Sequence, residues 1–226
     1  MVIDLDTTDD ALHGNQQLRF FHGYYAHYCY LPLSAVAQAD NGPSWPLFSW
    51  LRPAMHRERF GAATWLLVIL KAMTRAWHGT QLIVRADSGF ASPDIYRLCE
   101  HEGVSYVIGL ARNGRLEKLS EQYMQRARAA YQHTGQPVRV FGEFFYQAAS
   151  WRRQRRVVVK AQITATGGEN LRFVVHNSCG MKPEQVWEFY CGRGDMENRI
   201  KELKLALRVD KTSCHSFAAN AFRGLF

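Results

Sequence analysis

The chain has 226 residues, 47% of them hydrophobic, so it is long enough to bury a core and does not have the composition of a disordered segment. Its formal charge of +8 favours polyanionic partners, although many basic proteins bind no nucleic acid. The five cysteines form no C-x-x-C pair and no apolar run reaches transmembrane length, so we expect a cytoplasmic protein with no disulfide framework, structural zinc site or membrane partner.

Strand and helix patterns alternate in the first half of the chain. The predicted strands cover residues 1–8, about 20–37, about 45–51, 81–86 and 104–110. One predicted helix covers residues 66–77, and a second begins with Ser92 as N-cap and Pro93 at the first helical position. Alternation of this kind predicts an α/β fold built on one sheet.

The pattern changes between residues 113 and 180 and becomes rich in strands. A polar helix is predicted over 116–131, and strands are predicted over 138–148, 156–165 and 171–176. Within this region the segment FFYQAASWRRQRR combines aromatic residues with four arginines, Arg152, Arg153, Arg155 and Arg156. Such a composition suits DNA phosphates and unstacked bases. Alternatively, arginines at a hairpin tip or on an edge strand prevent sheet aggregation.

The segment after residue 184 carries a polar stripe that core packing does not explain. At about 100° per residue, one helical stripe contains Tyr190, Arg193, Glu197, Lys201, Lys204 and Arg208. Gly192 and Gly194 mark the first turn of this helix or a bend in it. The Glu197 carboxylate could hold a divalent cation while the basic side chains meet phosphate oxygens. A salt-bridged exposed face, with Glu197 and Lys201 four residues apart, is the alternative.

Two aspartates end predicted strands. Asp6 follows an apolar strand, where a carboxylate is costly to bury without a partner or a metal. Asp4 lies on the same face of that strand by its period of two and is the substitute, with Asp9 or Asp10 as further alternatives. Asp87 ends a second strand and precedes small residues, which indicates either a simple turn or the place where open α/β sheets position their sites.

These residues together resemble the bacterial insertion-sequence DDE transposases. The spacing of Tyr190, Arg193, Glu197 and Lys204 resembles the Y-R-E-K signature of that group. Asp6-Thr7-Thr8 resembles its first-strand D-T-T, which selects Asp6 over its neighbours, and the segment Arg85–Phe90 resembles its second-aspartate segment. The phrases LHGNQ, FFHGYY and MENRIKE extend the resemblance over nearly the whole chain.

The resemblance implies an RNase H-like fold, a mixed sheet flanked by helices, with a β-rich insertion before the catalytic helix. Residues 1–112 and 181–226 would form this catalytic core, and residues 113–180 the insertion. It also implies metal-dependent DNA cleavage and strand transfer at insertion-sequence ends. Asp6, Asp87 and Glu197 would hold two Mg²⁺ ions, or Mn²⁺ as a substitute, about 3.5–4 Å apart.

The implied partners are the terminal inverted repeats of the transposon and the target DNA, both double-stranded, bound by a homodimer associated with the nucleoid. Tyr190, Arg193, Lys201 and Lys204 would contact the DNA backbone. An N-terminal DNA-recognition region and a C-terminal end are expected to be missing, because the catalytic strand begins directly after Met1. A stand-alone RNase H-like nuclease or a truncated, non-catalytic DNA-binding remnant is the alternative.

Overall fold

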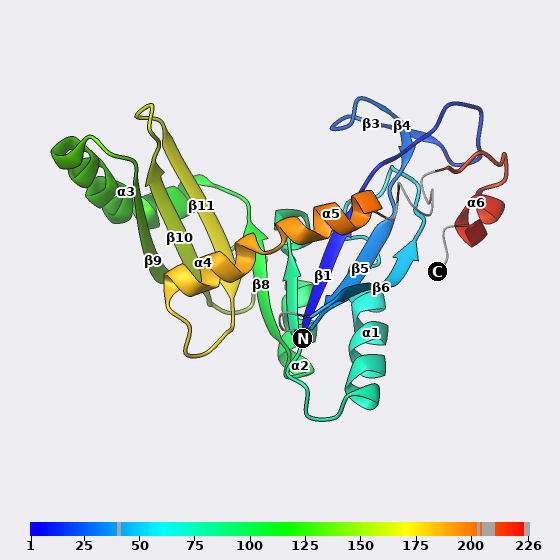
Figure 1. Ribbon diagram of the computed structural model, residues 1–226, viewed down its shortest axis with the longest axis horizontal. Helices are drawn as coiled ribbons and strands as arrows, with labels where there is room; N and C mark the ends of the chain where they lie inside the picture. The colour runs from blue at the N-terminus through cyan, green and yellow to red at the C-terminus, as the bar shows by residue number, and fades with distance from the viewer. Residues whose placement is uncertain (40–41, 203, 205–210, 224–226) are drawn as a thin grey trace. The chain divides into compact units, whose positions relative to one another are not determined.

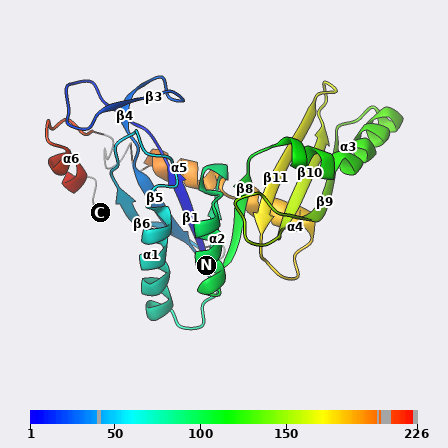
Figure 2. The ribbon, with the colours of Figure 1, turned by 180° about the vertical axis from the view of Figure 1, so that it is seen from behind.

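The computed structural model describes residues 1–39, 42–202, 204 and 211–223, apart from the side chains of Asp195, Glu197, Arg199 and Ile200. The chain forms two compact units, one comprising residues 1–90 and 193–226 and the other residues 91–192. Figures 1 and 2 show the ribbon from opposite sides. None of the helices in the described ranges has both the length and the apolar character needed to span a bilayer.

The first unit contains four strands of a mixed sheet, in the neighbour order β6-β5-β1-β7. β1 (Val2–Thr7) runs antiparallel to β5 (Leu33–Gln38) and parallel to β7 (Ile83–Ala86). β6 (Ser44–Trp50) pairs antiparallel with β5. The helices of this unit are α1 (Ala62–Ala76), the short 3₁₀ helix η1 (Ser88–Phe90), α5 (Gly194–Glu202) and α6 (Phe217–Arg223).

The two faces of β1 carry different chemistry because side chains alternate along a strand. Ile3 and Leu5 are fully buried on one face, while Asp4 and Asp6 point to the other. α5 packs on the aspartate face, where Met196 contacts Val36 of β5. α1 packs on the opposite face, where its Trp65 stacks on Phe48 of β6 at 4.8 Å (Figure 2). The sequence-predicted mixed sheet flanked by helices is confirmed.

Residues 20–37 form three strands, so the prediction of one strand there was wrong. β3 (Phe20–His22) and β4 (His27–Tyr30) form a hairpin, and only then does β5 begin. The hairpin turns at Ala26, which has a left-handed φ of 57° and donates its N–H to the His22 carbonyl at 2.9 Å. With β2 (Asp10–Ala11), the hairpin forms a small sheet in the order β2-β4-β3.

The second unit is an antiparallel sheet, in the order β8-β11-β10-β9, covered by helices. Its strands are β8 (Ser105–Leu110), β9 (Val138–Tyr146), β10 (Arg155–Ile163) and β11 (Glu169–His176), and its helices are α2 (Pro93–His101), α3 (Gly114–Thr134) and α4 (Pro183–Cys191). Val157, Val158 and Val159 of β10 are all fully buried, so both faces of this strand are covered. α3 and α4 both contact β10.

The helical cap predicted at Ser92 is confirmed. Its hydroxyl accepts a hydrogen bond from the Ile95 N–H at 3.5 Å, and Pro93 begins α2. Along the chain, the order β1, β5, β6, α1, β7, α2, β8 is the order of three strands, helix, strand, helix and strand expected of an RNase H-like fold. The assignment of residues 113–180 as an insertion stays a prediction.

The segment predicted as one helix after residue 184 is two helices. α4 ends at Cys191 and α5 begins at Gly194, so the chain leaves the helical path at Gly192 and Arg193. Two glycines within three residues weaken a helix by about 1 kcal/mol each relative to alanine, which explains a break at this place. Consequently Tyr190 belongs to the second unit, while Arg193 and Glu197 belong to the first.

Candidate active site

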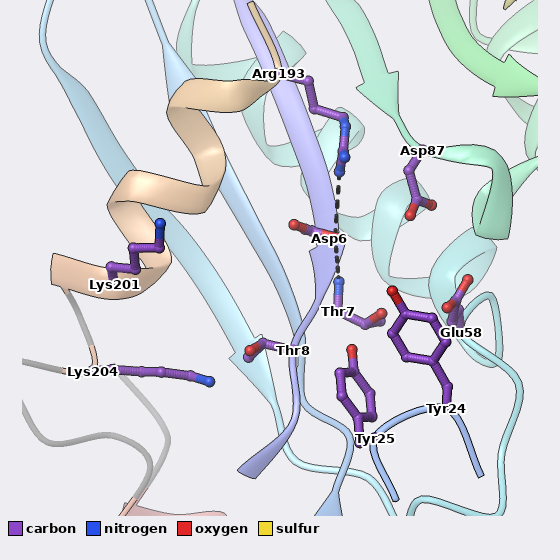
Figure 3. Close-up of a pocket in the computed structure, with 10 residues that line it drawn as sticks. All are labelled: Asp6, Thr7, Thr8, Tyr24, Tyr25, Glu58, Asp87, Arg193, Lys201 and Lys204. Atoms are coloured by element: carbon purple, nitrogen blue, oxygen red, sulfur yellow. Dashed lines mark hydrogen bonds and ion pairs between the residues drawn. The ribbon is translucent and has the colours of Figure 1, made fainter. Parts of the chain in front are cut away.

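A pocket of about 390 Å³ lies in the first unit, at the end of β1 (Figure 3). Carboxylates line one part of it and basic side chains another, while two tyrosines lie beside the carboxylates. The lining residues are Asp6, Thr7, Thr8, Tyr24, Tyr25, Glu58, Asp87, Arg193, Lys201 and Lys204. Five of these, Asp6, Asp87, Arg193, Lys201 and Lys204, are residues that the sequence singles out.

Asp6 and Asp87 come to the pocket from neighbouring strands. Asp6 lies near the end of β1, and Asp87 directly follows β7, which runs parallel to β1. Because the carboxyl ends of parallel strands lie at one edge of a sheet, the two side chains reach a common pocket. Asp6 Oδ1 accepts the Thr7 N–H at 2.9 Å, and Asp87 Oδ1 accepts the Gly89 N–H at 2.9 Å. These backbone bonds orient both carboxylates.

Asp4, the substitute for Asp6, has a different environment. It forms a bidentate ion pair with Arg85 of β7, with Nε–Oδ1 and Nη2–Oδ2 distances of 2.6 and 2.8 Å. Both side chains are about 5% exposed or less. Asp4 is absent from the pocket lining, which contains Asp6. The structure therefore places Asp4 inside the sheet and Asp6 at the pocket.

Glu58 is a pocket residue that the sequence interpretation missed. It lies on the loop between β6 and α1, which buried Arg52 anchors by donating to the carbonyls of Glu58 and Phe60, each at 2.7 Å. A side chain at Gly89 would overlap the Glu58 carboxylate, so the glycine makes room for it. Burial, and then the charge of Asp87, raise the pKa of Glu58 above its ordinary value.

The signal that could have found Glu58 is weak. It stands in the charged loop segment HRERF, between two apolar segments, and nothing in its spacing relates it to Asp87. Only the folded chain brings the β6–α1 loop against the turn after β7.

The basic residues of the pocket are Arg193, which directly precedes α5, Lys201 in the last turn of α5, and Lys204 beyond its end. Arg193 Nη1 lies 3.6 Å from Asp6 Oδ1. Lys201 is exposed. Lys204 donates to the Asp9 carbonyl at 2.8 Å, and its Nζ lies 3.5 Å from Asp9 Oδ1. Asp9, an alternative to Asp6 in the sequence, therefore pairs with a basic residue of the pocket wall.

Tyr190, Glu197 and Arg208 of the predicted helical stripe are not among the described residues that line this pocket. Position 197 belongs to α5, but the Glu197 side chain lies outside the described residues, as does the whole of Arg208. Tyr190 lies in α4 of the second unit, where its ring is 5.7 Å from that of Trp187.

The four arginines of the second unit have unequal environments. Arg155 is buried, its guanidinium forms bonds of 2.9 and 3.0 Å with the Glu100 carboxylate, and it lies over the Tyr96 ring at 4.9 Å. This location assigns Arg155 to internal packing, because a buried and paired guanidinium is not accessible to DNA, so the predicted DNA contact is not retained for it. Arg152 is exposed, and Arg153 is exposed although it pairs with Glu100 at 2.6 Å.

Arg156 is partly exposed. It donates to the Ser178 carbonyl and lies 3.7 Å from Glu143.

The Glu100 pairing predicts a pH dependence of stability. Burial alone would raise the pKa of Glu100, but hydrogen bonds from Arg155 and Tyr106 and the charge of Arg155 outweigh burial and lower it. A lowered carboxyl pKa contributes stability above the ordinary value of 4.5, and this is lost as pH falls below that value towards the folded-state pKa. We expect Glu100→Gln to lower the Tm at pH 7 and to lose this deficit progressively below about pH 4.5.

Thermal unfolding of both proteins between pH 3 and 7 measures the effect. Glu117→Gln is the matched control, because Glu117 forms an exposed pair with Arg112 that contributes little. An equal Tm deficit for Glu100→Gln at every pH would contradict a lowered pKa of Glu100 in the folded protein.

The donor chemistry of the pocket suits a hard divalent cation. Among the residues whose side chains are described, no three His, Cys, Asp or Glu side chains are grouped closely enough to hold a metal ion. Asp6 and Asp87 nevertheless present carboxylate oxygens, the donors that Mg²⁺ prefers, to one pocket. The residues that are present therefore fit such an ion.

Comparison with known proteins identifies the family. No curated protein matches the chain. Among solved structures, a piggyBac transposase synaptic complex with hairpin DNA is similar over 88% of this chain at 10% sequence identity and a TM-score of 0.46, and this chain spans 40% of the length of that one. The model of the family described as transposase DDE domain group 1 matches residues 1–226. The chain therefore belongs to the transposase DDE domain family, group 1.

Proposed function

We propose that this chain is the catalytic domain of a DNA transposase acting at insertion-sequence ends. It would cleave a phosphodiester bond with water, and the freed 3′-hydroxyl would then attack a phosphodiester of the target DNA. The observation that carries the proposal is the pocket at the end of β1. There Asp6 and Asp87, from adjacent parallel strands, lie in one cavity with Arg193, Lys201 and Lys204.

Asp6, Asp87 and Glu197 would hold Mg²⁺, or Mn²⁺ in its place. The assignment of Glu197 is supported by Lys201, which lies one helical turn further along α5 and lines the pocket. When bound, the divalent cation supplies Lewis acidity to the phosphate and to the attacking oxygen. The protein's own contribution is to hold the carboxylates, which the bonds from Thr7 and Gly89 do for Asp6 and Asp87.

The basic residues of the pocket would hold the DNA strand. Arg193 has a planar guanidinium that can bind a phosphate through two N–H groups, whereas Lys201 and Lys204 act as point charges. Lys204 is oriented by Asp9, and Arg193 is oriented towards Asp6. By binding the phosphates next to the scissile one, these residues would fix the position of the scissile phosphate. They would also prevent the DNA strand from binding one nucleotide further along.

Double-stranded DNA is the proposed partner, as terminal inverted repeats and as target. In the second unit, Arg152, Arg153 and Arg156 would contact backbone phosphates, and Tyr190 would contact the strand near the cleaved bond. Two copies of the chain would act together, because transposition brings two ends of the element to one place.

A nicking assay tests the proposal. The purified chain is incubated with a labelled duplex that carries the element's own terminal repeat, with Mg²⁺, with Mn²⁺ or with EDTA. We expect metal-dependent nicking at the repeat, and Glu197→Gln is expected to lower its rate roughly a thousandfold or more. Glu184→Gln, a substitution of the same kind at an exposed position of α4, is the control.

The DNA products of this assay distinguish three possible activities of the chain. Nicking followed by joining of the 3′ end to a second duplex supports a transposase. Nicking without specificity for the repeat and without joining would support a stand-alone nuclease, and DNA binding without metal-dependent cleavage would support a non-catalytic remnant.

A further inference from the structure

The β3–β4 hairpin of the first unit carries aromatic side chains that the fold does not bury. Tyr24 is 86% exposed, Phe21 58% and Tyr28 45%. Large aromatic side chains normally supply core or interface area, so exposed rings that the fold does not use mark a surface available for binding. The proposed cleavage chemistry uses none of these rings.

The rings of this hairpin are held by one another. Phe21 and Tyr28 are directly opposite across the two strands and meet edge to face, with centroids 5.7 Å apart. Tyr24 meets Tyr25 edge to face at 5.1 Å, and Tyr25 in turn contacts the ring of His22 at 5.0 Å. The exposed rings are therefore oriented before any ligand binds, so binding need not order them.

One basic side chain accompanies the Phe21–Tyr28 pair. The guanidinium of Arg19 lies over the Tyr28 ring at 4.7 Å and is held by a 2.8 Å hydrogen bond from its Nη1 to the Gly14 carbonyl. The whole chain has a formal charge of +8. Near Tyr24, the cations are those of the pocket that it lines, Arg193, Lys201 and Lys204. An aromatic ring for stacking together with cations for phosphates is the combination that binds single-stranded nucleic acid.

Tyr24 connects the hairpin to the pocket. Its hydroxyl points towards the carboxylates of the pocket in Figure 3, and it lines that pocket together with Asp6 and Asp87. Its ring remains open to solvent. A DNA strand with a phosphate in the pocket would therefore pass beside this ring. A base within a stacked duplex cannot offer its face to such a ring, so the base that meets Tyr24 must be unpaired.

We propose that the β3–β4 hairpin binds an unpaired base of DNA beside the cleavage pocket, with Tyr24 as the main stacking platform. The inference rests on the proposed function for the presence of DNA at the pocket, but the stacking itself requires neither metal nor cleavage.

Fluorescence of a single-stranded oligonucleotide containing 2-aminopurine tests this inference. Binding is measured in EDTA, so that no cleavage takes place. The wild-type chain is expected to quench the fluorescence when a base stacks on Tyr24. Tyr24→Ala is expected to weaken single-strand binding about 5- to 150-fold and to lose the quenching, while Tyr24→Phe keeps both. Binding of a blunt duplex should be the same for all three proteins.

Trp77→Ala is the matched control. Trp77 is 44% exposed and follows the end of α1, at the opposite end of this unit from the hairpin (Figure 1). This variant should bind the single strand like the wild type. Because Tyr24 is so exposed, its replacement should not impair folding, and thermal unfolding of Tyr24→Ala checks this.

Three results would overturn the inference. One is unchanged single-strand affinity and quenching in Tyr24→Ala. Another is an equal loss of duplex and single-strand binding. The third is dissociation of a dimer by Tyr24→Ala in sedimentation velocity with no change in oligonucleotide binding, which would make the hairpin a protein interface. If the chain stacks a base on Tyr24 but never nicks DNA, the proposed function fails and this inference stands. If the chain nicks DNA but no base stacks on Tyr24, this inference fails and the proposed function stands.

Discussion

Asp6→Asn is expected to abolish DNA cleavage while leaving the protein folded. The substitution keeps the shape of the side chain and an oxygen that can accept the Thr7 N–H, but it removes the charge that a divalent cation requires. We expect the nicking rate on the terminal-repeat duplex to fall roughly a thousandfold or more. The free energy of unfolding should change by less than about 1 kcal/mol, because the Thr7 hydrogen bond is kept and the contact with Arg193, at 3.6 Å, is a long one between partly exposed side chains.

The matched control for this prediction is Asp94→Asn. Asp94 lies in α2, its side chain is 69% exposed, and it pairs only with Arg97 at 2.5 Å in the described structure. This variant should nick DNA at the wild-type rate. Cleavage by Asp6→Asn at more than about a tenth of the wild-type rate, under metal saturation, would remove Asp6 from the catalytic set.

Breaking the Asp4–Arg85 ion pair is expected to have the largest effect on stability. Both partners are about 5% exposed or less, so removing one leaves a buried charge without its counterion. Such a loss typically costs about 3–5 kcal/mol. We expect Arg85→Ala and Asp4→Ala each to lower the free energy of unfolding by this amount, measured by urea denaturation with circular dichroism.

The double variant Asp4→Leu/Arg85→Met separates charge from packing. An apolar pair of similar volume can replace a buried ion pair at little cost, so this protein should recover most of the lost stability. Asp6 and Asp87 are unchanged in it, so its cleavage should survive at temperatures where it is folded. Single variants within about 0.5 kcal/mol of wild type would contradict the assigned role of the pair.

The sequence predicts the sheet, and the shared face of Asp4 and Asp6 on its first strand, because both depend on local patterns of residues. Alternation in VIDLDTT places Asp4 and Asp6 on one face of β1, and the structure confirms that arrangement. Alternation cannot say which of the two reaches a pocket. That choice depends on Arg85, which lies opposite Asp4 in the register of β7 and neutralises it.

Other features required the folded chain because their partners are distant in sequence. Glu58 meets the Gly89 turn through a loop that Arg52 anchors, and no local pattern marks that contact. In the sequence RRQRR nothing distinguishes Arg155 from its exposed neighbour Arg153. Arg155 is nevertheless buried, where it pairs with Glu100, 55 residues earlier in the chain. The sequence marks Gly192 and Gly194 as the first turn of the C-terminal helix or a bend in it, and the structure shows that the chain changes there from α4 to α5.

The position of Arg85 also reduces the negative potential at the pocket, because it pairs with Asp4. Two residues along a strand span about 7 Å, which is shorter than the screening distance of physiological salt, about 8 Å. An uncompensated Asp4 would therefore add its negative potential to that of Asp6, Glu58 and Asp87 and would repel an approaching phosphate. Arg85 neutralises Asp4 within the sheet, so the remaining negative potential comes from the carboxylates that line the pocket. A bound cation can offset that potential, which allows the DNA phosphates to approach.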